Sequence, residues 1–195
     1  MISQLSASVA DSPLPPPFDD LYLSSLAPGD FPRLVDLYNN TDLSSILLSP
    51  PYPYTLADAQ WFHDNRAHSP VPGHSGTHEI WVVRSRSHAG LLVGICGTHP
   101  GPEHPPGTIT LGYFTAPEFR GRGIMPAVLN EVLQKFPGAS FQAEAEAGNG
   151  SSQKVLQKAG FSRVEGSERL LEWPESKGGG FRNMWKYVKE QPSAE

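Results

Sequence analysis

The stretch TITLGYFTAPEFRGRGIMPAVLNEVLQKF, residues 108–136, decides the fold because three local patterns follow one another in it. Its first nine residues are rich in Thr, Ile, Tyr and Phe and predict a β-strand over 108–116. A basic, glycine-containing turn comes next, and Pro126 then falls in the first turn of a helix, where its missing N–H costs nothing. We predict this helix over 122–136 because apolar residues recur there at helical spacing, namely Met125, Val128, Leu129, Val132, Leu133 and Phe136.

The residues that follow predict a second strand beside the first. Pro137 and Gly138 end the helix, and the segment SFQAEAEA, residues 140–147, has the pattern of a strand. A strand, a helix and a strand within about forty residues form a crossover unit, so the two strands should be parallel. A short helix is expected over 151–159, with Gly160 at the position of a left-handed C-cap.

The rest of the chain supplies further elements on both sides of this unit. Helices are predicted over 30–40, with Asp30 as the N-cap, and over 55–66, where Thr55 and Asp58 form a capping box. The remaining predicted strands cover 78–86, 90–97, 161–173 and 181–188. We therefore expect an α+β domain, a mixed and mostly antiparallel sheet of about seven strands with one parallel crossover and about four helices.

Composition limits the class of protein. The 195 residues include 19 Gly and 20 Pro, and the clusters of these residues indicate a flexible arm over 1–17, a domain over 18–189 and a frayed end over 190–195. A net charge of −5 argues against binding of nucleic acid, and no apolar run is long enough for a membrane span. The single cysteine, Cys96, is expected to be a buried thiol in a cytoplasmic monomer or homodimer.

The turn between strand and helix is a candidate anion site. Gly121 and Gly123 have no side chains, so backbone N–H groups at the start of the helix can approach an anion closely. Arg120 and Arg122 add positive charge and donors that suit phosphate oxygens. On local chemistry alone, this turn is either a diphosphate cradle or a tight turn with two solvated arginines.

The stretch GYFTAPEFRGRGIMPAVLNEVL resembles the acyl-CoA-binding core of the GNAT acetyltransferase superfamily, whose signature is [RQ]-x-x-G-x-[GA] after a strand. Arg120 and Gly123 match this signature, and Met125 replaces its last small residue. A second block, NGSSQKVLQKAGF at 149–161, resembles the pattern N-x-x-S-x-x-V-L-x-K-x-G-F of the RimJ/RimL-like branch. That branch contains N-terminal and small-amine acetyltransferases.

The resemblance implies where acetyl-CoA would lie. In this superfamily it occupies a V-shaped opening between the two parallel strands, and the acceptor amine attacks the acetyl carbon directly. Phe114, Thr115 and Ala116 would offer backbone groups to the pantetheine arm, with Asn149 on the other side of the cleft. An N–H near Phe114 would polarise the thioester carbonyl. The pyrophosphate would be held by Arg120, Gly121, Arg122, Gly123, Ile124 and Met125. No metal is implied.

The catalytic groups are less clearly indicated. Many relatives protonate the departing thiolate with a Tyr at the position of Leu156, and Ser152 would take that role here unless it merely caps its helix. A Glu commonly serves as base at the position of Thr110, which cannot do so. Glu144 and Glu146 are the nearest replacements, although alternating Ala and Glu is also the pattern of any half-exposed strand.

The sequence thus predicts an acetyl-CoA-dependent N-acetyltransferase that acts on a primary amine, either a protein N-terminal α-amine or a small-molecule amine. Weak general-base catalysis favours an acceptor with a low pKa, such as an α-amine. Two alternatives remain open at this point: a catalytically idle protein that binds acetyl-CoA or CoA, and a binding module for another phosphate ligand.

Overall fold

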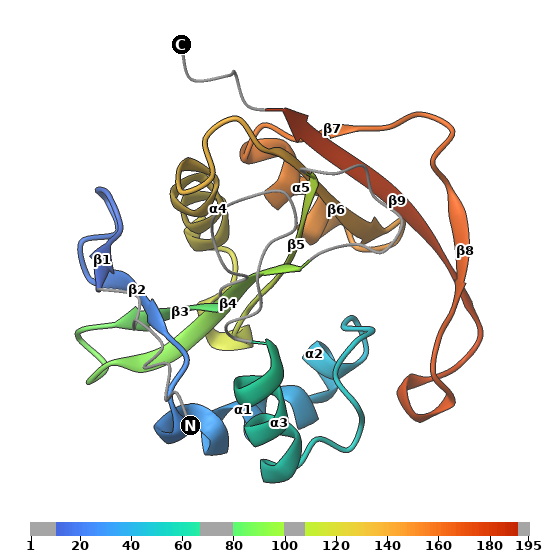
Figure 1. The fold of residues 1–195 in the computed structure, drawn as a ribbon. Helices are drawn as coiled ribbons and strands as arrows, with labels where there is room; N and C mark the ends of the chain where they lie inside the picture. Colours follow the sequence, from blue (N-terminus) through green and yellow to red (C-terminus); the bar gives the residue numbers. More distant parts are fainter. Residues whose placement is uncertain (1–10, 67–79, 100–107, 191–195) are drawn as a thin grey trace, which may run out of the picture.

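The computed structural model describes residues 11–66, 80–99 and 108–190, and their strands form one mixed sheet (Figure 1). The sheet follows the order β1-β2-β3-β4-β5-β6-β9-β7, with β8 also paired to β9. Its strands are β1 (Ser12–Pro13), β2 (Leu21–Ser25), β3 (Ile80–Ser85), β4 (Leu91–His99), β5 (Thr108–Thr115), β6 (Ser140–Glu146), β7 (Ser162–Arg163), β8 (Arg169–Glu172) and β9 (Phe181–Glu190). The pair β5–β6 is parallel and the other pairs are antiparallel, which confirms the predicted fold class and crossover.

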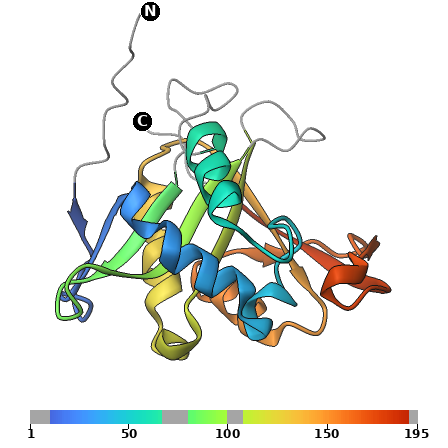
Figure 2. The ribbon, with the colours of Figure 1, turned by 90° about the horizontal axis from the view of Figure 1, so that it is seen from below.

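The helices lie in two groups, one on each face of the sheet (Figures 1 and 2). One face is covered by α1 (Phe31–Asn39), α2 (Thr41–Ser44) and α3 (Leu56–Arg66). The other is covered by α4 (Ile124–Gln134) and α5 (Gly150–Lys158). The six apolar residues of the predicted helix face, from Met125 to Phe136, are all buried, so this face packs α4 onto the sheet.

The helix caps predicted from the sequence are found only in part in the structure. At α3, Thr55 and Asp58 form the predicted capping box: the Thr55 N–H donates to Asp58 Oδ2 at 2.8 Å, and the Asp58 N–H donates to Thr55 Oγ1 at 3.2 Å. Gly160 has a φ of 82° after α5, as its predicted C-cap position requires. Asp30 is the N-cap residue of α1, as predicted, but its side chain makes no capping hydrogen bond.

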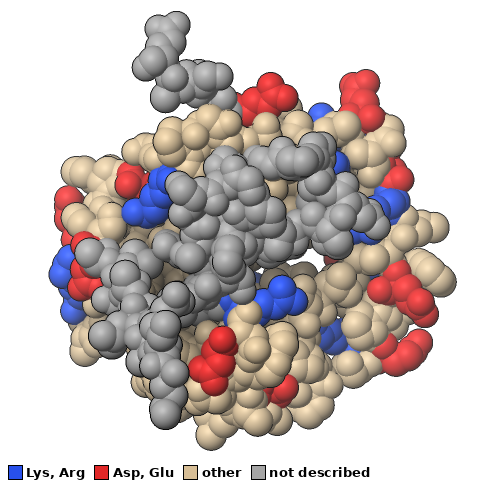
Figure 3. Space-filling view, in the orientation of Figure 1, with Lys and Arg blue, Asp and Glu red and all other residues tan. Residues whose placement is uncertain are grey.

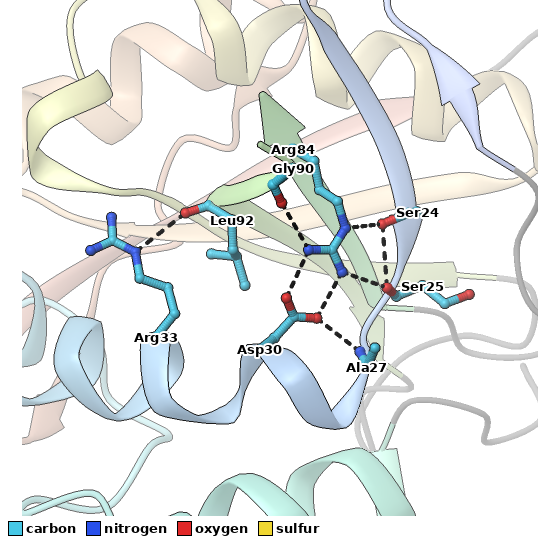
Figure 4. Close-up of polar contacts among 8 residues, drawn as sticks. All are labelled: Ser24, Ser25, Ala27, Asp30, Arg33, Arg84, Gly90 and Leu92. Carbon is cyan, nitrogen blue, oxygen red and sulfur yellow. Dashed lines mark hydrogen bonds and ion pairs between the residues drawn. The ribbon is translucent and has the colours of Figure 1, made fainter. Parts of the chain in front are cut away.

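The Asp30 carboxylate is instead used for a long-range ion pair (Figure 4). Arg84 on β3 donates to both Asp30 oxygens at 2.7 Å, and Asp30 also accepts the backbone N–H of Ala27 at 2.9 Å. The Asp30 side chain is 8% exposed and the Arg84 side chain 15%. The pair joins the start of α1 to β3, and loss of either partner would leave the other charge buried without its counter-charge.

The N-terminal and C-terminal parts of the sheet differ from the prediction. The single strand expected over 161–173 is two short strands, β7 and β8, because Gly166 turns the chain with a φ of 71° between them. The short strands β1 and β2 and the short helix α2 were not predicted. Ordered pairing begins at Ser12, and Leu14 is buried, so the stretch 12–14 does not behave as the expected flexible arm.

Some predictions fall outside the described residues. These are the first ten residues of the arm, the last five residues of the chain and the start of the strand predicted at 78; the Pro- and Gly-rich sequences 69–76 and 100–107 also lie there. Within the described ranges, no helix is both long and apolar enough to cross a membrane.

Candidate functional site

The parallel strands β5 and β6 pair over only three residues each. Thr108, Ile109 and Thr110 lie opposite Ser140, Phe141 and Gln142. Beyond that point β5 stays paired to β4 as far as Thr115, while β6 stays paired to β9 as far as Glu146. The facing edges of the two strands therefore lack a ladder partner in the described chain, and this opens a cleft between them.

A cavity of about 670 Å³ occupies this cleft. It is bounded by β5, the turn that leads into α4, the end of β6, one side of α5, the β8–β9 pair and the residues after α2. The residues predicted for the site that line it are Phe114, Thr115, Arg120, Gly121, Arg122, Gly123, Ile124, Met125, Glu144, Glu146, Asn149 and Ser152. Ala116 does not line it: this residue is fully buried, and its N–H donates to the Val93 carbonyl at 2.9 Å.

The turn before α4 has the backbone geometry that its glycines suggested. Gly121 has a φ of 77° and Gly123 a φ of 76°, both in the left-handed region that favours glycine. Gly123 is the N-cap of α4, and no side chain makes a capping hydrogen bond there. The first N–H groups of α4 and the positive end of its dipole are therefore available to an anion at the cavity wall.

Two arginines brace this turn. Arg120 Nε donates to the Thr115 carbonyl at 3.2 Å, and an Arg122 amino group donates to the Glu118 carbonyl at 3.0 Å. Both side chains belong to exposed residues, and each keeps further N–H groups beyond the one used in the turn. Both guanidinium groups therefore lie near the start of α4 and have N–H groups that the turn does not use.

The cavity is basic although the chain is acidic. Its lining contains the acidic residues Glu144 and Glu146 and five basic residues, which are Arg120, Arg122, Lys154, Lys158 and Arg169. Figure 3 shows acidic and basic side chains spread over one face of the molecule, with basic ones beside a hollow near its centre. In a chain of net charge −5, this local excess of positive charge favours an anionic ligand.

Met125, the departure from the GNAT signature, is accommodated by the core. The side chain is 3% exposed, and its Cε lies 3.4 Å from the place where a Cβ would stand on Gly94. Because Gly94 has no side chain, the thioether fits against β4. The Met125 backbone therefore lies at the start of α4, while its side chain points into the core.

Ser152 lies in the first turn of α5 but does not cap it. The N-cap is Asn149, whose Oδ1 accepts the Ser152 N–H at 3.0 Å. The Ser152 hydroxyl is 2.9 Å from the hydroxyl of Tyr113 on β5. Capping of α5 therefore belongs to Asn149, and the Ser152 hydroxyl contacts Tyr113 at the cavity.

The two candidate bases on β6 are both paired with arginines. Glu144 accepts from Arg169 Nε at 2.9 Å and from the second Arg169 nitrogen at 2.6 Å. Glu146 accepts from Arg182 at 3.1 Å, and the same Arg182 nitrogen donates to the Ser45 carbonyl at 2.7 Å. Thr110 is buried and accepts from Gln142 Nε2 at 3.0 Å. Each of the two carboxylates on β6 is therefore already engaged by a guanidinium group.

Sequence reasoning missed three residues at this site. Tyr113 contacts Ser152, Arg182 holds Glu146, and Lys177 donates to the Leu47 and Leu48 carbonyls. Each contact joins segments at least 36 residues apart, and Lys177 reaches across 130 positions. Only strand alternation could have hinted at Tyr113, by placing it on the opposite face of β5 from Phe114.

Comparisons with known proteins agree with this geometry. The family model of the acetyltransferase (GNAT) domain matches residues 20–162. No curated protein sequence gives a significant match.

Solved structures of acetyltransferases share the fold. A spermidine N-acetyltransferase from Vibrio cholerae, in complex with CoA and spermine, is 17% identical with a TM-score of 0.65; the match covers 88% of this chain and 96% of that one. RimL, a ribosomal L7/L12 α-N-protein acetyltransferase in complex with CoA, is 14% identical with a TM-score of 0.68, over 94% and 99% of the two chains. A ribosomal-protein-alanine N-acetyltransferase from Brucella melitensis is 19% identical with a TM-score of 0.67, over 86% and 98%.

The match to the family model spans most of the chain, from β2 to the start of β7, and includes the open parallel pair, the glycine turn and most of the residues that line the basic cavity. The chain belongs to the GNAT acetyltransferase family.

Proposed function

We propose that this protein is an N-acetyltransferase that binds acetyl-CoA in the cavity between β5 and β6 and transfers its acetyl group directly to a primary amine. The observation that carries the proposal is the turn at Arg120–Met125, where left-handed glycines and two arginines stand at an uncapped helix start on the cavity wall. That donor set suits the pyrophosphate of CoA. Acetyl-CoA supplies an activated thioester, so the chain needs no nucleophile of its own.

The facing edge of β5 has backbone groups for the rest of the cofactor. Beyond Thr110 this edge has no ladder partner on β6, so the backbone groups of β5 that face the cleft can bond to an extended amide chain as another strand would. A backbone N–H on that edge also suits the thioester carbonyl, because a fixed donor stabilises the negative charge that develops there during transfer. Asn149 and Ser152 approach from the α5 side of the same cavity.

We expect the acceptor to be an amine of low pKa that carries no second positive charge. Glu144 and Glu146 are paired with Arg169 and Arg182, so neither carboxylate of β6 is left unpaired to attract a polycation. An α-amine with a pKa near 8 is about one-tenth neutral at pH 7, whereas a lysine side chain near 10.4 is almost fully charged. We therefore expect a protein N-terminal α-amine or a small monoamine, as in the RimJ/RimL-like branch, and an intracellular protein that meets such amines.

Calorimetry tests the cofactor step. Acetyl-CoA and CoA should both bind the wild-type protein, and the double variant Arg120→Ala/Arg122→Ala should bind at least ~10-fold more weakly because two charged donors are lost. The matched control is Arg66→Ala/Lys135→Ala, which removes the same charge at exposed residues outside the cavity. Equal affinity in both double variants would place the cofactor elsewhere.

A panel of acceptors tests the transfer. Release of free thiol from acetyl-CoA is followed with peptides that carry a free N-terminus, the same peptides with a blocked N-terminus, small monoamines and spermine. Turnover should occur with free α-amines or monoamines and should be far slower with blocked peptides and spermine. Tight CoA binding without turnover on any amine would instead support the idle CoA-binding alternative.

A further inference from the structure

The cavity between β5 and β6 has walls from both layers of helices. Its lining includes the start of α4 and one side of α5, and it also includes the residues that follow α2. Because α2 lies on the opposite face of the sheet from α4 and α5, the cavity passes through the sheet where the β5–β6 ladder ends (Figures 1 and 2). We call the part formed by the residues after α2 and by the β8–β9 pair the α2 side of the cavity.

The α2 side has two apolar walls. One is the segment after α2, where Ile46 and Leu48 are each 38% exposed and both line the cavity. The other wall is the β8–β9 pair, where strand alternation places Leu171 and Met184 on the same face, and both of these residues line the cavity. Trp173, which is buried at the end of β8, extends this wall. Apolar side chains that are grouped and partly exposed around a cavity favour an apolar ligand group.

Hydrogen bonds hold the two walls together. Lys177, between β8 and β9, donates to the carbonyls of Leu47 and Leu48, and Arg182 on β9 donates to the Ser45 carbonyl at 2.7 Å. The bonds use backbone oxygens of the segment after α2, so the apolar side chains of that segment take no part in them. The spacing of the walls is therefore set before a ligand binds, which favours selection by size and shape.

The charged groups on the α2 side are engaged in pairs. Glu144 is paired with Arg169, and Glu146 is paired with Arg182, so each pair joins β6 to the β8–β9 region. The other basic residues of the lining come from the turn before α4 and from α5. The cavity is thus divided, with unpaired positive charge toward α4 and α5 and apolar surface beside closed ion pairs on the α2 side.

We propose that the acceptor binds at the α2 side and that this side selects primary amines with a bulky apolar group close to the nitrogen. The inference rests on the proposed function and narrows its acceptor. Acetyl-CoA held at the turn before α4 approaches from the opposite helix layer, so both substrates can be bound at the same time. The chemistry is shared by peptides that begin with Leu, Phe or Met and by small apolar monoamines.

Leu48 and Leu171 are the specificity-determining residues, because they line the cavity from its two walls. A bulky apolar group between them removes apolar surface from water, and each additional methylene in such a pocket raises kcat/KM by about 10-fold or more. An acceptor with a small first residue leaves that surface in water. A second positive charge on the acceptor meets no unpaired carboxylate of β6, since both are engaged.

A purely structural role for these leucines has a different signature. If Leu48 and Leu171 only pack the walls together, their replacement by Ala lowers stability and slows the reaction of every acceptor by the same factor. Selection predicts instead a change in the ratio of kcat/KM between a bulky and a small acceptor. A uniform loss of active protein cannot change that ratio.

The first test compares peptides that differ only in their first residue. With saturating acetyl-CoA, thiol release should give a kcat/KM at least ~10-fold higher for peptides that begin with Leu or Phe than for those that begin with Ala or Ser. Peptides that begin with Lys or Asp should be the slowest. The comparison of 3-methylbutylamine with ethylamine repeats the test for small amines, and the faster of the two series identifies the source of the acceptor.

The second test uses matched variants. Leu48→Ala and Leu171→Ala should each lower the preference for Leu over Ala at the first position at least ~5-fold, with the CoA dissociation constant changed less than ~2-fold. The controls are Leu170→Ala, a neighbour on β8 that is 71% exposed outside the cavity, and Leu56→Ala, exposed on α3 outside the cavity. Both controls should keep the wild-type preference. Leu171→Met, which conserves volume, should keep most of it.

The third test needs no transfer. Calorimetry on the protein saturated with CoA should show leucine amide binding at least ~5-fold more tightly than alanine amide, and Leu171→Ala should remove the difference. Equal kcat/KM for Leu and Ala peptides, or the same preference in Leu171→Ala as in Leu170→Ala, overturns the inference and leaves the acetyltransferase proposal intact. Failure to acetylate any amine overturns the proposed function; in that case the binding of the two amides still decides whether the cavity selects apolar amines.

Discussion

At the scale of single residues, the site depends on two glycines whose role is conformational. Gly121 and Gly123 have positive φ values, and a Cβ on Gly121 would meet no atom within 4 Å, so the cost of a side chain there is backbone strain and not a clash. L-residues in this region are strained by roughly 1–2 kcal/mol. The strain would be relieved by moving the very N–H groups that we assign to the pyrophosphate.

Gly121→Ala should therefore reduce both stability and cofactor affinity. Gly138→Ala is the matched control, since Gly138 has a φ of 76°, open space around it and a position at the far end of α4 outside the cavity. Both variants should lose roughly 1–2 kcal/mol in denaturant unfolding. Only Gly121→Ala should weaken CoA in calorimetry, and an equal loss of affinity in both would show that the turn has no special role.

A second prediction at this scale concerns buried acids. Burial raises the pKa of Cys96 from an ordinary value of 9.0 to about 12, and it also raises the pKa values of Tyr38, Tyr54 and Tyr113. As pH rises, each group loses its proton in the unfolded chain before it does so in the folded chain. Between its pKa in the unfolded chain and its pKa in the folded chain, the folded state therefore binds more protons. The stabilisation is complete below about pH 9 and declines as the pH rises towards 12.

The free energy of unfolding should thus fall between about pH 8 and about pH 10, and Cys96→Ala should show a smaller fall than the wild type. Urea titrations at both pH values measure the difference. The absolute stability of the variant is not the criterion, because removing a buried side chain leaves a cavity that costs stability at every pH. Identical pH slopes in the two proteins would contradict the prediction.

At the scale of elements, the Asp30–Arg84 pair joins the start of α1 to β3, and Lys177 joins the segment between β8 and β9 to the residues after α2. Arg84 also donates to Ser24 Oγ at 2.6 Å and to the Gly90 carbonyl at 3.1 Å, so its buried charge is well satisfied. Arg33 on α1 reaches Glu118, beside the cofactor turn. Helix α1 is therefore linked both to β3 and to the turn that we assign to the cofactor.

Asp30→Asn should destabilise the protein by about 3–5 kcal/mol, because it leaves the buried Arg84 without its counter-charge. Asp36→Asn, an exposed change on the same helix, should stay within about 0.5 kcal/mol of the wild type. Denaturant unfolding checks both. A cost for Asp30→Asn as small as that of the control would mean that the pair contributes little to anchoring α1.

Lys177 supports one wall of the cavity. It is 7% exposed and donates to the carbonyls of Leu47 and Leu48, residues that line the cavity, and burial lowers its pKa. Lys177→Met should raise the KM for the amine ~3–10-fold and leave the CoA dissociation constant unchanged, because it loosens one wall of the cavity only. Lys135→Ala at the exposed end of α4 should change neither constant. Weaker CoA binding in Lys177→Met would contradict this division.

At the scale of the whole molecule, the function depends on an interrupted sheet. Within the described chain, all pairs of strands are antiparallel except β5–β6. That parallel pair ends after three residues, and the cleft beyond it is lined by several strands and helices. Positive charge gathers at that cleft in an acidic molecule. We therefore expect the affinity for CoA to decrease as the salt concentration rises. Calorimetry at low and high ionic strength measures this change. An affinity that does not decrease with salt would argue against charge as a main contributor to binding.

The sequence by itself determined the elements whose signals are local. The helix after the glycine turn, the left-handed glycines, the Thr55–Asp58 capping box and the parallel crossover are fixed by residues close together in the chain, so periodicity and turn chemistry predicted them. The turn within 161–173 was also local, and Gly166 was its signal. The short strands β1 and β2 had too few residues for a pattern and form only because β3 offers β2 a ladder partner.

Only the tertiary structure decided which side chains act together. Asp30 carries a good N-cap signal, yet Arg84, 54 positions away, takes its carboxylate. Glu144 and Glu146 look free on their strand and are paired with arginines of the β8–β9 region. Tyr113 meets Ser152 across 39 positions. Local patterns report backbone preferences over a few residues, whereas charge pairing and proton transfer depend on distances that arise only when remote segments pack against each other.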